Sequence, residues 1–111
     1  MRWIELNNQE QLESIFNSTE PLVLFKHSTR CSVSNMALKY FEKEWNSDQE
    51  LPTYFLDVLQ NRTLSNLISE RFHVHHETPQ ILVIQNKECI LDASHQDISA
   101  QEVLEVLEKK S

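Results

Sequence analysis

Cys31 is the residue of this sequence best placed to do chemistry. Residues 25–45 read FKHSTRCSVSNMALKYFEKEW, which places Cys31 between a short apolar strand and a predicted helix. Unpaired backbone amides and the positive end of the helix dipole favour an anion at that point, which for cysteine is the thiolate. The thiolate is the form that attacks disulfides. The alternative is that Cys31 is an ordinary small residue at a helix start.

Ser34 follows Cys31 by three residues, where many redox proteins carry a second cysteine. Residues three apart share one face of a helix, so we expect the Ser34 hydroxyl to donate a hydrogen bond to the Cys31 thiolate. Serine cannot form a disulfide with Cys31. The pair therefore predicts a one-thiol cycle, in which Cys31 attacks a mixed disulfide, holds the removed thiol and is released by a second small thiol. Lys26 and Arg30 are close to Cys31 in sequence, and we expect their positive charges to help stabilise the thiolate.

The elements that must position these residues alternate between strands and helices. Apolar runs predict strands at 3–6, 21–26, 53–58, 80–85 and 88–93. Apolar residues at helical spacing predict helices at 9–16, 31–45 and 64–72, and after the capping box of Ser99 and Glu102. This order describes the thioredoxin architecture. We therefore expect an α/β, thioredoxin-like fold in a single domain over residues 1–111, with a central mixed sheet and helices on both faces.

Thr78 and Pro79 stand immediately before the strand at 80–85. In thioredoxin-type folds the proline at this point is cis and faces the active cysteine, which leaves the backbone of the preceding residue free to pair with a thiol-bearing ligand. A proline at the first position of a strand is also compatible with a trans bond, and only about 5 to 6% of X-Pro bonds are cis. The spacing from Cys31 favours cis, so we expect Thr78 and Pro79 to bind substrate.

Two further groups of residues are of types that could do chemistry. Cys89 falls in the second strand of the predicted hairpin, where a half-buried thiol packs as a small hydrophobe. Alternatively, Cys89 resolves an adduct on Cys31, which requires the two thiols to come within reach of each other. The segment HVHHE at 73–77 lacks the cysteine pair and second ligand set of a typical zinc site, so we assign no metal.

The bulk composition narrows the class of protein. The 111 residues carry a formal net charge of −7, which argues against nucleic-acid binding. No apolar run approaches the ~20 residues of a membrane span, and the amino terminus does not resemble a secretion signal. With only two cysteines, we expect a cytoplasmic protein without a structural disulfide. Because the sequence contains no glycine, turns with positive φ are expected to use Asn or Asp.

Three segments, FKHSTRCSVSNMAL, HETPQILVI and DASHQDIS, closely resemble the monothiol bacilliredoxins of the bacillithiol redox system, in this order and over nearly the whole chain. The resemblance implies a thioredoxin-like fold and the reduction of mixed disulfides between bacillithiol and protein cysteines. It implies that Cys31 is the nucleophile, and it matches Ser34, Thr78 and Pro79 to family motifs. The family usually reads Thr-Cys-Pro-x-Ser, whereas residues 30–34 read RCSVS.

The resemblance also implies the partners. The protein partners are bacillithiolated client proteins. The co-substrate is bacillithiol or a similar low-molecular-weight thiol. No tightly bound cofactor is expected. The malate end of bacillithiol carries two carboxylates, so cationic residues near Cys31 are expected to bind it. Nearness in sequence suggests Lys26, His27, Arg30 and His75. Two alternatives stay open: a thioredoxin-fold sensing or binding module whose Cys31 is capped without turnover, and a two-cysteine reductase that uses Cys89.

Overall fold

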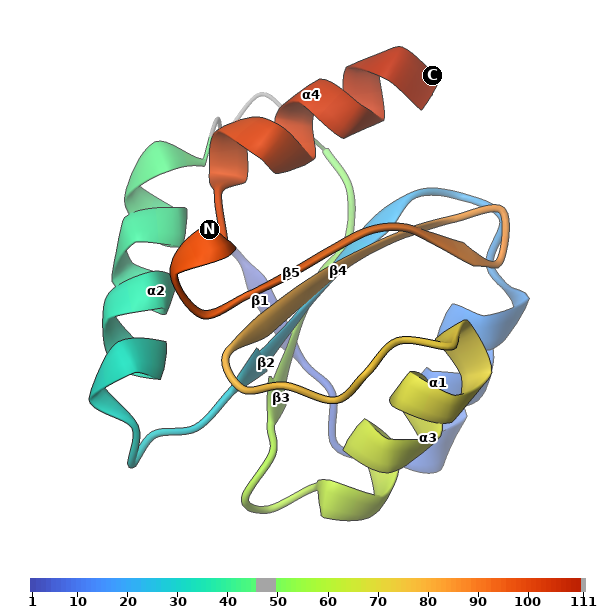
Figure 1. The fold of residues 1–111 in the computed structure, drawn as a ribbon. Coiled ribbons are helices and arrows are strands. Elements are labelled where there is room, and N and C mark those ends of the chain that lie inside the picture. The colour runs from blue at the N-terminus through green and yellow to red at the C-terminus, as the bar shows by residue number, and fades with distance from the viewer. Residues whose placement is uncertain (46–49, 111) are drawn as a thin grey trace.

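The computed structural model describes residues 1–45 and 50–110 as one five-stranded sheet flanked by helices (Figure 1). In chain order the elements are β1 (Trp3–Glu5), α1 (Gln9–Asn17), β2 (Leu22–His27), α2 (Ser32–Glu44), β3 (Thr53–Asp57), α3 (Arg62–Phe72), β4 (Gln80–Gln85), β5 (Glu88–Ser94), the 3-10 helix η1 (His95–Asp97) and α4 (Ala100–Lys110). The predicted alternation is confirmed, apart from the unpredicted η1. None of the described helices is long and apolar enough to cross a membrane.

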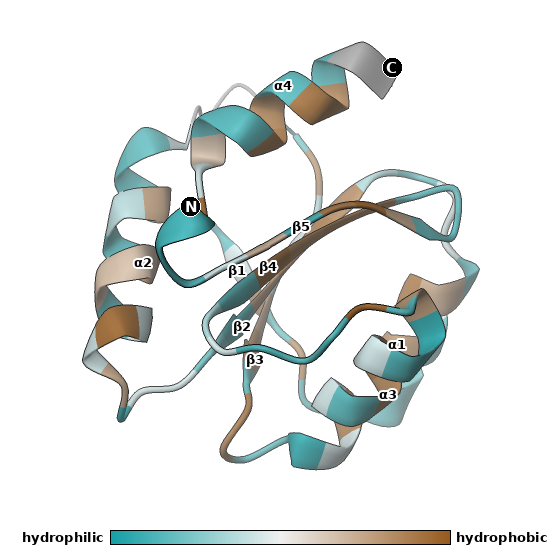
Figure 2. Ribbon diagram, viewed as in Figure 1, coloured by the Kyte–Doolittle hydropathy of each residue, from teal (hydrophilic) through white to brown (hydrophobic). Residues whose placement is uncertain are grey.

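The sheet has the strand order β1-β3-β2-β4-β5. Strand β3 pairs in parallel with both β1 and β2, whereas β4 runs antiparallel to β2 and to β5. Helices α2 and α4 cover one face, and α1 and α3 cover the other (Figure 1). This confirms the predicted mixed sheet with helices on both faces. Figure 2 shows the apolar central strands between helices that carry both hydrophilic and hydrophobic residues.

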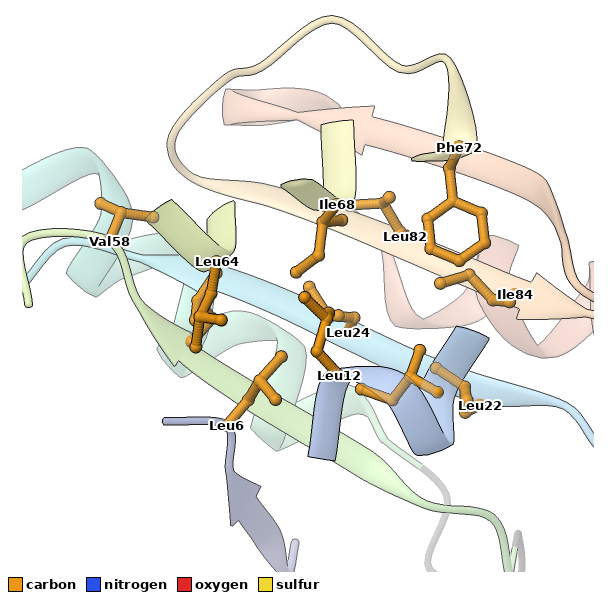
Figure 3. Close-up of a cluster of buried hydrophobic side chains, with 12 residues drawn as sticks. Leu6, Leu12, Leu22, Leu24, Val58, Leu64, Ile68, Phe72, Leu82 and Ile84 are labelled. Carbon is orange, nitrogen blue, oxygen red and sulfur yellow. The ribbon is translucent and has the colours of Figure 1, made fainter. Parts of the chain in front are cut away.

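Strand β2 is buried along its whole length, and its side chains point alternately to the two faces of the sheet. Leu24 joins the core under α1 and α3, which Figure 3 shows in close-up. Phe25 joins the core under α2 and α4. By the same alternation, Lys26 points toward α3 and His27 toward α2. This alternation decides which of the two residues meets the start of α2.

Two predicted helix caps are formed. Asn8 caps α1, where its Oδ1 accepts a hydrogen bond of 2.9 Å from the backbone N–H of Gln11. Ser99 precedes α4, and its Oγ accepts a bond of 3.3 Å from the backbone N–H of Glu102. These side chains satisfy amides that have no acceptor within the helix. Local sequence signals therefore set the starts of α1 and α4.

The expectation for turns with positive φ was largely wrong. Among the described residues, positive φ occurs at His73, Asn86, Lys87 and His95. Asn86 and Lys87 join β4 to β5 with φ values of 54° and 66°, the signs that a type I′ turn requires. His73 ends α3 in the left-handed conformation with φ 56°. Only Asn86 is of an expected type, although histidine is also enriched in this region.

Candidate active site

Cys31 occupies the N-cap position of α2, immediately before the first helical residue, and is partly exposed. Its backbone N–H donates to the carbonyl of Ser28 at 3.2 Å, and its own carbonyl accepts from the amide of Asn35 at 3.0 Å. The Cys31 side chain makes no capping hydrogen bond. The amides of the first helical turn have no acceptor within the helix. Cys31 therefore stands at the helix position whose free amides favour an anion.

An open groove with a cavity volume of about 510 Å³ lies beside Cys31. Val33 and Thr78 line it, together with residues 94–97 at the end of β5 and in η1. The peptide bond between Thr78 and Pro79 is cis. The structure thus brings Cys31 and Thr78 to one groove, although 47 positions separate them in the chain.

Residues 94–97 form a wall of the groove that the sequence reasoning missed. The backbone N–H of His95 donates to the carbonyl of Pro79 at 3.0 Å, which joins this wall to the loop that carries Thr78. The His95 Nε2 lies 3.4 Å from an oxygen of Glu77, whose other oxygen is 3.6 Å from the Nε2 of His75. One signal could have found this wall, because it lies within the segment DASHQDIS that carries the family resemblance.

Ser34 differs from the expectation. Its side chain is fully buried, and its Oγ lies 2.6 Å from Nδ1 of His27 and accepts a bond of 3.1 Å from the backbone N–H of Ser28. These contacts replace the expected bond to Cys31. Cys31 is the N-cap residue of α2, with φ −110° and ψ 118°, and its side chain makes no capping hydrogen bond, whereas Ser34 points toward the end of β2. Ser34 instead ties the start of α2 to the end of β2.

His27 is a buried partner of Ser34 rather than a cation in the groove. Its pKa is lowered from the ordinary value by burial, against the opposing effects of Asp57, a hydrogen bond that the ring donates to the Asn35 side chain, and Glu42. A lowered pKa favours the neutral imidazole, in which one ring nitrogen donates and the other accepts, and Nδ1 is the nitrogen that faces the Ser34 hydroxyl. His27 therefore does not supply the positive charge that a carboxylate ligand would need.

Lys26 and Arg30 do not line the groove with Cys31. The Lys26 side chain is fully buried, and its Nζ contacts Ser65, Ser69 and His76. Burial lowers its pKa to about 8. The cause of this placement is strand alternation, which turns Lys26 away from α2. Arg30 is exposed in the loop before Cys31.

Cys89 lies at the far end of the sheet from Cys31. It pairs with Ile84, which in turn pairs with Leu22, whereas Cys31 follows the opposite end of β2 at His27. Five residue steps along β2 span roughly 17 Å. A disulfide needs Cα atoms within roughly 7 Å, so Cys89 cannot resolve an adduct on Cys31 in this fold. The Cys89 thiol donates to the carbonyl of Leu91 at 3.3 Å, and burial raises its pKa to about 11.

In the ranges 1–45 and 50–110, no three histidine, cysteine or acidic side chains are arranged to hold a metal ion. The residues of HVHHE make other contacts. His76 contacts Lys26, and His75 lies near Glu77. The carbonyl of His75 accepts a bond of 2.8 Å from Nε2 of Gln80. These contacts hold the loop that leads to Thr78.

Comparison with known proteins agrees with this geometry. A solved structure described as a candidate oxidoreductase with a thioredoxin fold matches with a TM-score of 0.82 and 29% identity, covering 94% of this chain and 92% of that one. Thioredoxin from Schistosoma mansoni matches with a TM-score of 0.72 and 18% identity over 98% of both chains. Thioredoxin from Malassezia sympodialis matches with a TM-score of 0.71 and 13% identity, covering 95% of this chain and 87% of that one.

The fold is therefore that of the thioredoxins, with one cysteine at the start of the helix that follows β2. The family model for the monothiol bacilliredoxin BrxC matches residues 4–103. This chain belongs to the monothiol bacilliredoxin family.

Proposed function

We propose that this protein is a monothiol thiol-disulfide oxidoreductase that reduces mixed disulfides between bacillithiol and protein cysteines. The observation that carries the proposal is the position of Cys31, a partly exposed thiol at the start of α2 beside the groove that Thr78 lines. Family membership supports bacillithiol as the small thiol, and we propose that the reaction occurs in a reducing cytoplasm.

The cycle has two thiol-disulfide exchanges. The Cys31 thiolate attacks the bacillithiol sulfur of the mixed disulfide, forms a new S–S bond to it and displaces the protein thiolate, which takes up a proton. A second bacillithiol, as its thiolate, then attacks the bacillithiol sulfur held on Cys31. This exchange yields oxidised bacillithiol and regenerates the Cys31 thiolate. The protein cysteine is thus reduced and one free bacillithiol is oxidised, because it forms a disulfide with the bacillithiol removed from the protein.

The residues around Cys31 contribute position and charge stabilisation. The amides of the first turn of α2 can donate to the sulfur when it is anionic. The backbone of Thr78 is proposed to pair with the bound disulfide across the groove. Ser34 contributes by fixing the start of α2 against β2 through its bonds to His27 and Ser28. Arg30 is exposed before Cys31 and is proposed to attract the carboxylates of bacillithiol.

The test is multiple turnover with a bacillithiolated protein, compared with the same protein glutathionylated. We expect turnover with bacillithiol, a bacillithiol adduct on Cys31 by mass spectrometry, and complete loss of both in Cys31→Ser. Cys89→Ser is the matched control and should retain wild-type rates, because Cys89 lies at the other end of the sheet. A stable adduct on Cys31 without turnover on several substrates would establish a sensing module instead.

A further inference from the structure

Lys26 is a buried ammonium that the proposed cycle does not use directly. Its Nζ lies 3.1 Å from the carbonyl of Ser65, 2.8 Å from Oγ of Ser69 and 3.1 Å from Nδ1 of His76. These three acceptors match the three protons of an ammonium group. Among the residues that the structure describes, no carboxylate lies within salt-bridge distance of Nζ.

A buried lysine without an anionic partner is not expected to stabilise a protein core. Desolvation disfavours the charged form, and an apolar side chain of similar volume is often neutral or stabilising at such a site. The contacts of Lys26 have a different geometric effect. They join β2, which leads into Cys31, to α3 and to His76 in the loop between α3 and β4, here called loop 73–79.

Loop 73–79 carries Thr78 to the groove, and a second buried side chain holds it. Gln80 is the partner of Lys26 across the β2–β4 pair, so both side chains lie on the same face of the sheet. Gln80 is buried and donates from Nε2 to the carbonyl of His75 at 2.8 Å. Two neighbouring polar side chains of the sheet thus hold two successive residues of the loop, His75 and His76.

We propose that Lys26 is a positioning residue for the reaction, and that its contact with His76 holds loop 73–79 so that Thr78 faces a disulfide bound at Cys31. This inference rests on the proposed function. Lys26 touches neither the sulfur nor the groove, so it acts through the loop. Its loss should weaken the binding of a mixed disulfide while the reactivity of Cys31 toward a small alkylating reagent stays the same.

The experiment compares Lys26→Met and His76→Leu with the wild type. Met retains an unbranched stem, whereas Leu removes the Nδ1 acceptor from a residue that is only partly buried. In each variant we expect the KM for a bacillithiolated protein to rise by about tenfold, with kcat within about twofold. The Lys26–His76 contact is lost in both single variants, although Lys26→Met also removes the contacts to Ser65 and Ser69, and His76→Leu also removes a contact of 3.2 Å to Ser65 Oγ. The rise in KM of the double variant should therefore be smaller than the product of the two single effects. His76→Gln, which offers an amide oxygen to Nζ, should recover part of the affinity.

Two controls separate positioning from general damage. Lys87→Met removes a lysine charge from the exposed β4–β5 turn and should leave KM unchanged. Alkylation of Cys31 by iodoacetamide should proceed at the wild-type rate in every variant. Amide hydrogen exchange should quicken in loop 73–79 of Lys26→Met and His76→Leu, and remain unchanged in α2.

The outcomes distinguish this inference from the proposed function. If the wild type does not turn over a bacillithiolated protein, the proposed oxidoreductase function is refuted. Wild-type turnover with an unchanged KM in folded Lys26→Met refutes the positioning role alone. A parallel fall in alkylation rate would also overturn it, because Lys26 would then act on Cys31 itself. If Lys26→Met does not fold, His76→Leu decides the question, and a wild-type KM in that variant refutes the inference.

Discussion

Replacing Lys26 by Met changes the pH dependence of stability by an amount that follows from the burial of this residue. Burial lowers the pKa of Lys26 from 10.5 to about 8. Met retains the stem but has no charge and no titrating group. Because one pKa unit is worth about 1.36 kcal/mol, the difference between the two values corresponds to about 3 kcal/mol in total.

The sign follows from proton binding. In the folded protein Lys26 loses its proton near pH 8, whereas in the unfolded chain it stays protonated up to about pH 10.5. Between these values the unfolded state binds more protons, so the free energy of unfolding rises with pH. This contribution is absent from Lys26→Met. From pH 7 to pH 9.5, the wild type should gain about 2 kcal/mol relative to the variant.

The assay is urea unfolding of both proteins at a series of pH values, followed by tryptophan fluorescence. Cys89 adds an opposing slope above about pH 9, since burial raises its pKa to about 11 and the unfolded thiol ionises first. Both proteins share that slope, so it cancels in their difference. Lys87→Met, at an exposed position, should follow the wild type. Parallel stability curves for the wild type and Lys26→Met would refute the reasoning.

Three further predictions test other parts of the structure. Ser34→Ala should lower the free energy of unfolding by about 1–3 kcal/mol, because it leaves His27 Nδ1 and the Ser28 amide without their partner. A loss no larger than that of a surface serine in urea unfolding would contradict this contact. At pH 8, iodoacetamide should leave the Cys89 thiol almost unmodified in peptide mass spectra, since its pKa is raised to about 11. Rapid labelling of Cys89 would show that it is not held as described. Asn8→Ala should cost about 1 kcal/mol in the same unfolding assay, because the first turn of α1 loses its cap, and an unchanged stability would argue against that cap.

Local patterns in the sequence predicted most elements of the fold. The apolar runs at β2 and β4, the helical spacing in α2 and α3, and the caps Asn8 and Ser99 each predicted an element that the structure contains. The short η1 was missed because three residues, HQD, show no hydrophobic periodicity. His73, Lys87 and His95 have positive φ although they are neither Asn nor Asp, so residue type did not predict these three conformations.

The candidate site was less predictable, because it depends on directions that nearness in sequence does not give. Lys26 and His27 are adjacent, yet one contacts α3 and the other α2. Ser34 points inward, where its Oγ contacts His27 and Ser28. Nearness also suggested that Lys26 binds substrate, whereas the structure encloses its ammonium under α3.

The sequence by itself determined the order of strands and helices, the thiol at the start of α2, and the kinship with the bacilliredoxins. These depend on residue type and short spacing, which act within a few positions of the chain. The tertiary structure alone decided that Cys89 lies beyond the reach of Cys31, that residues 94–97 wall the groove, and that Lys26 holds the loop before Thr78. Those relations depend on strand register and on which helix covers each face of the sheet, and both are settled only when the whole core packs together.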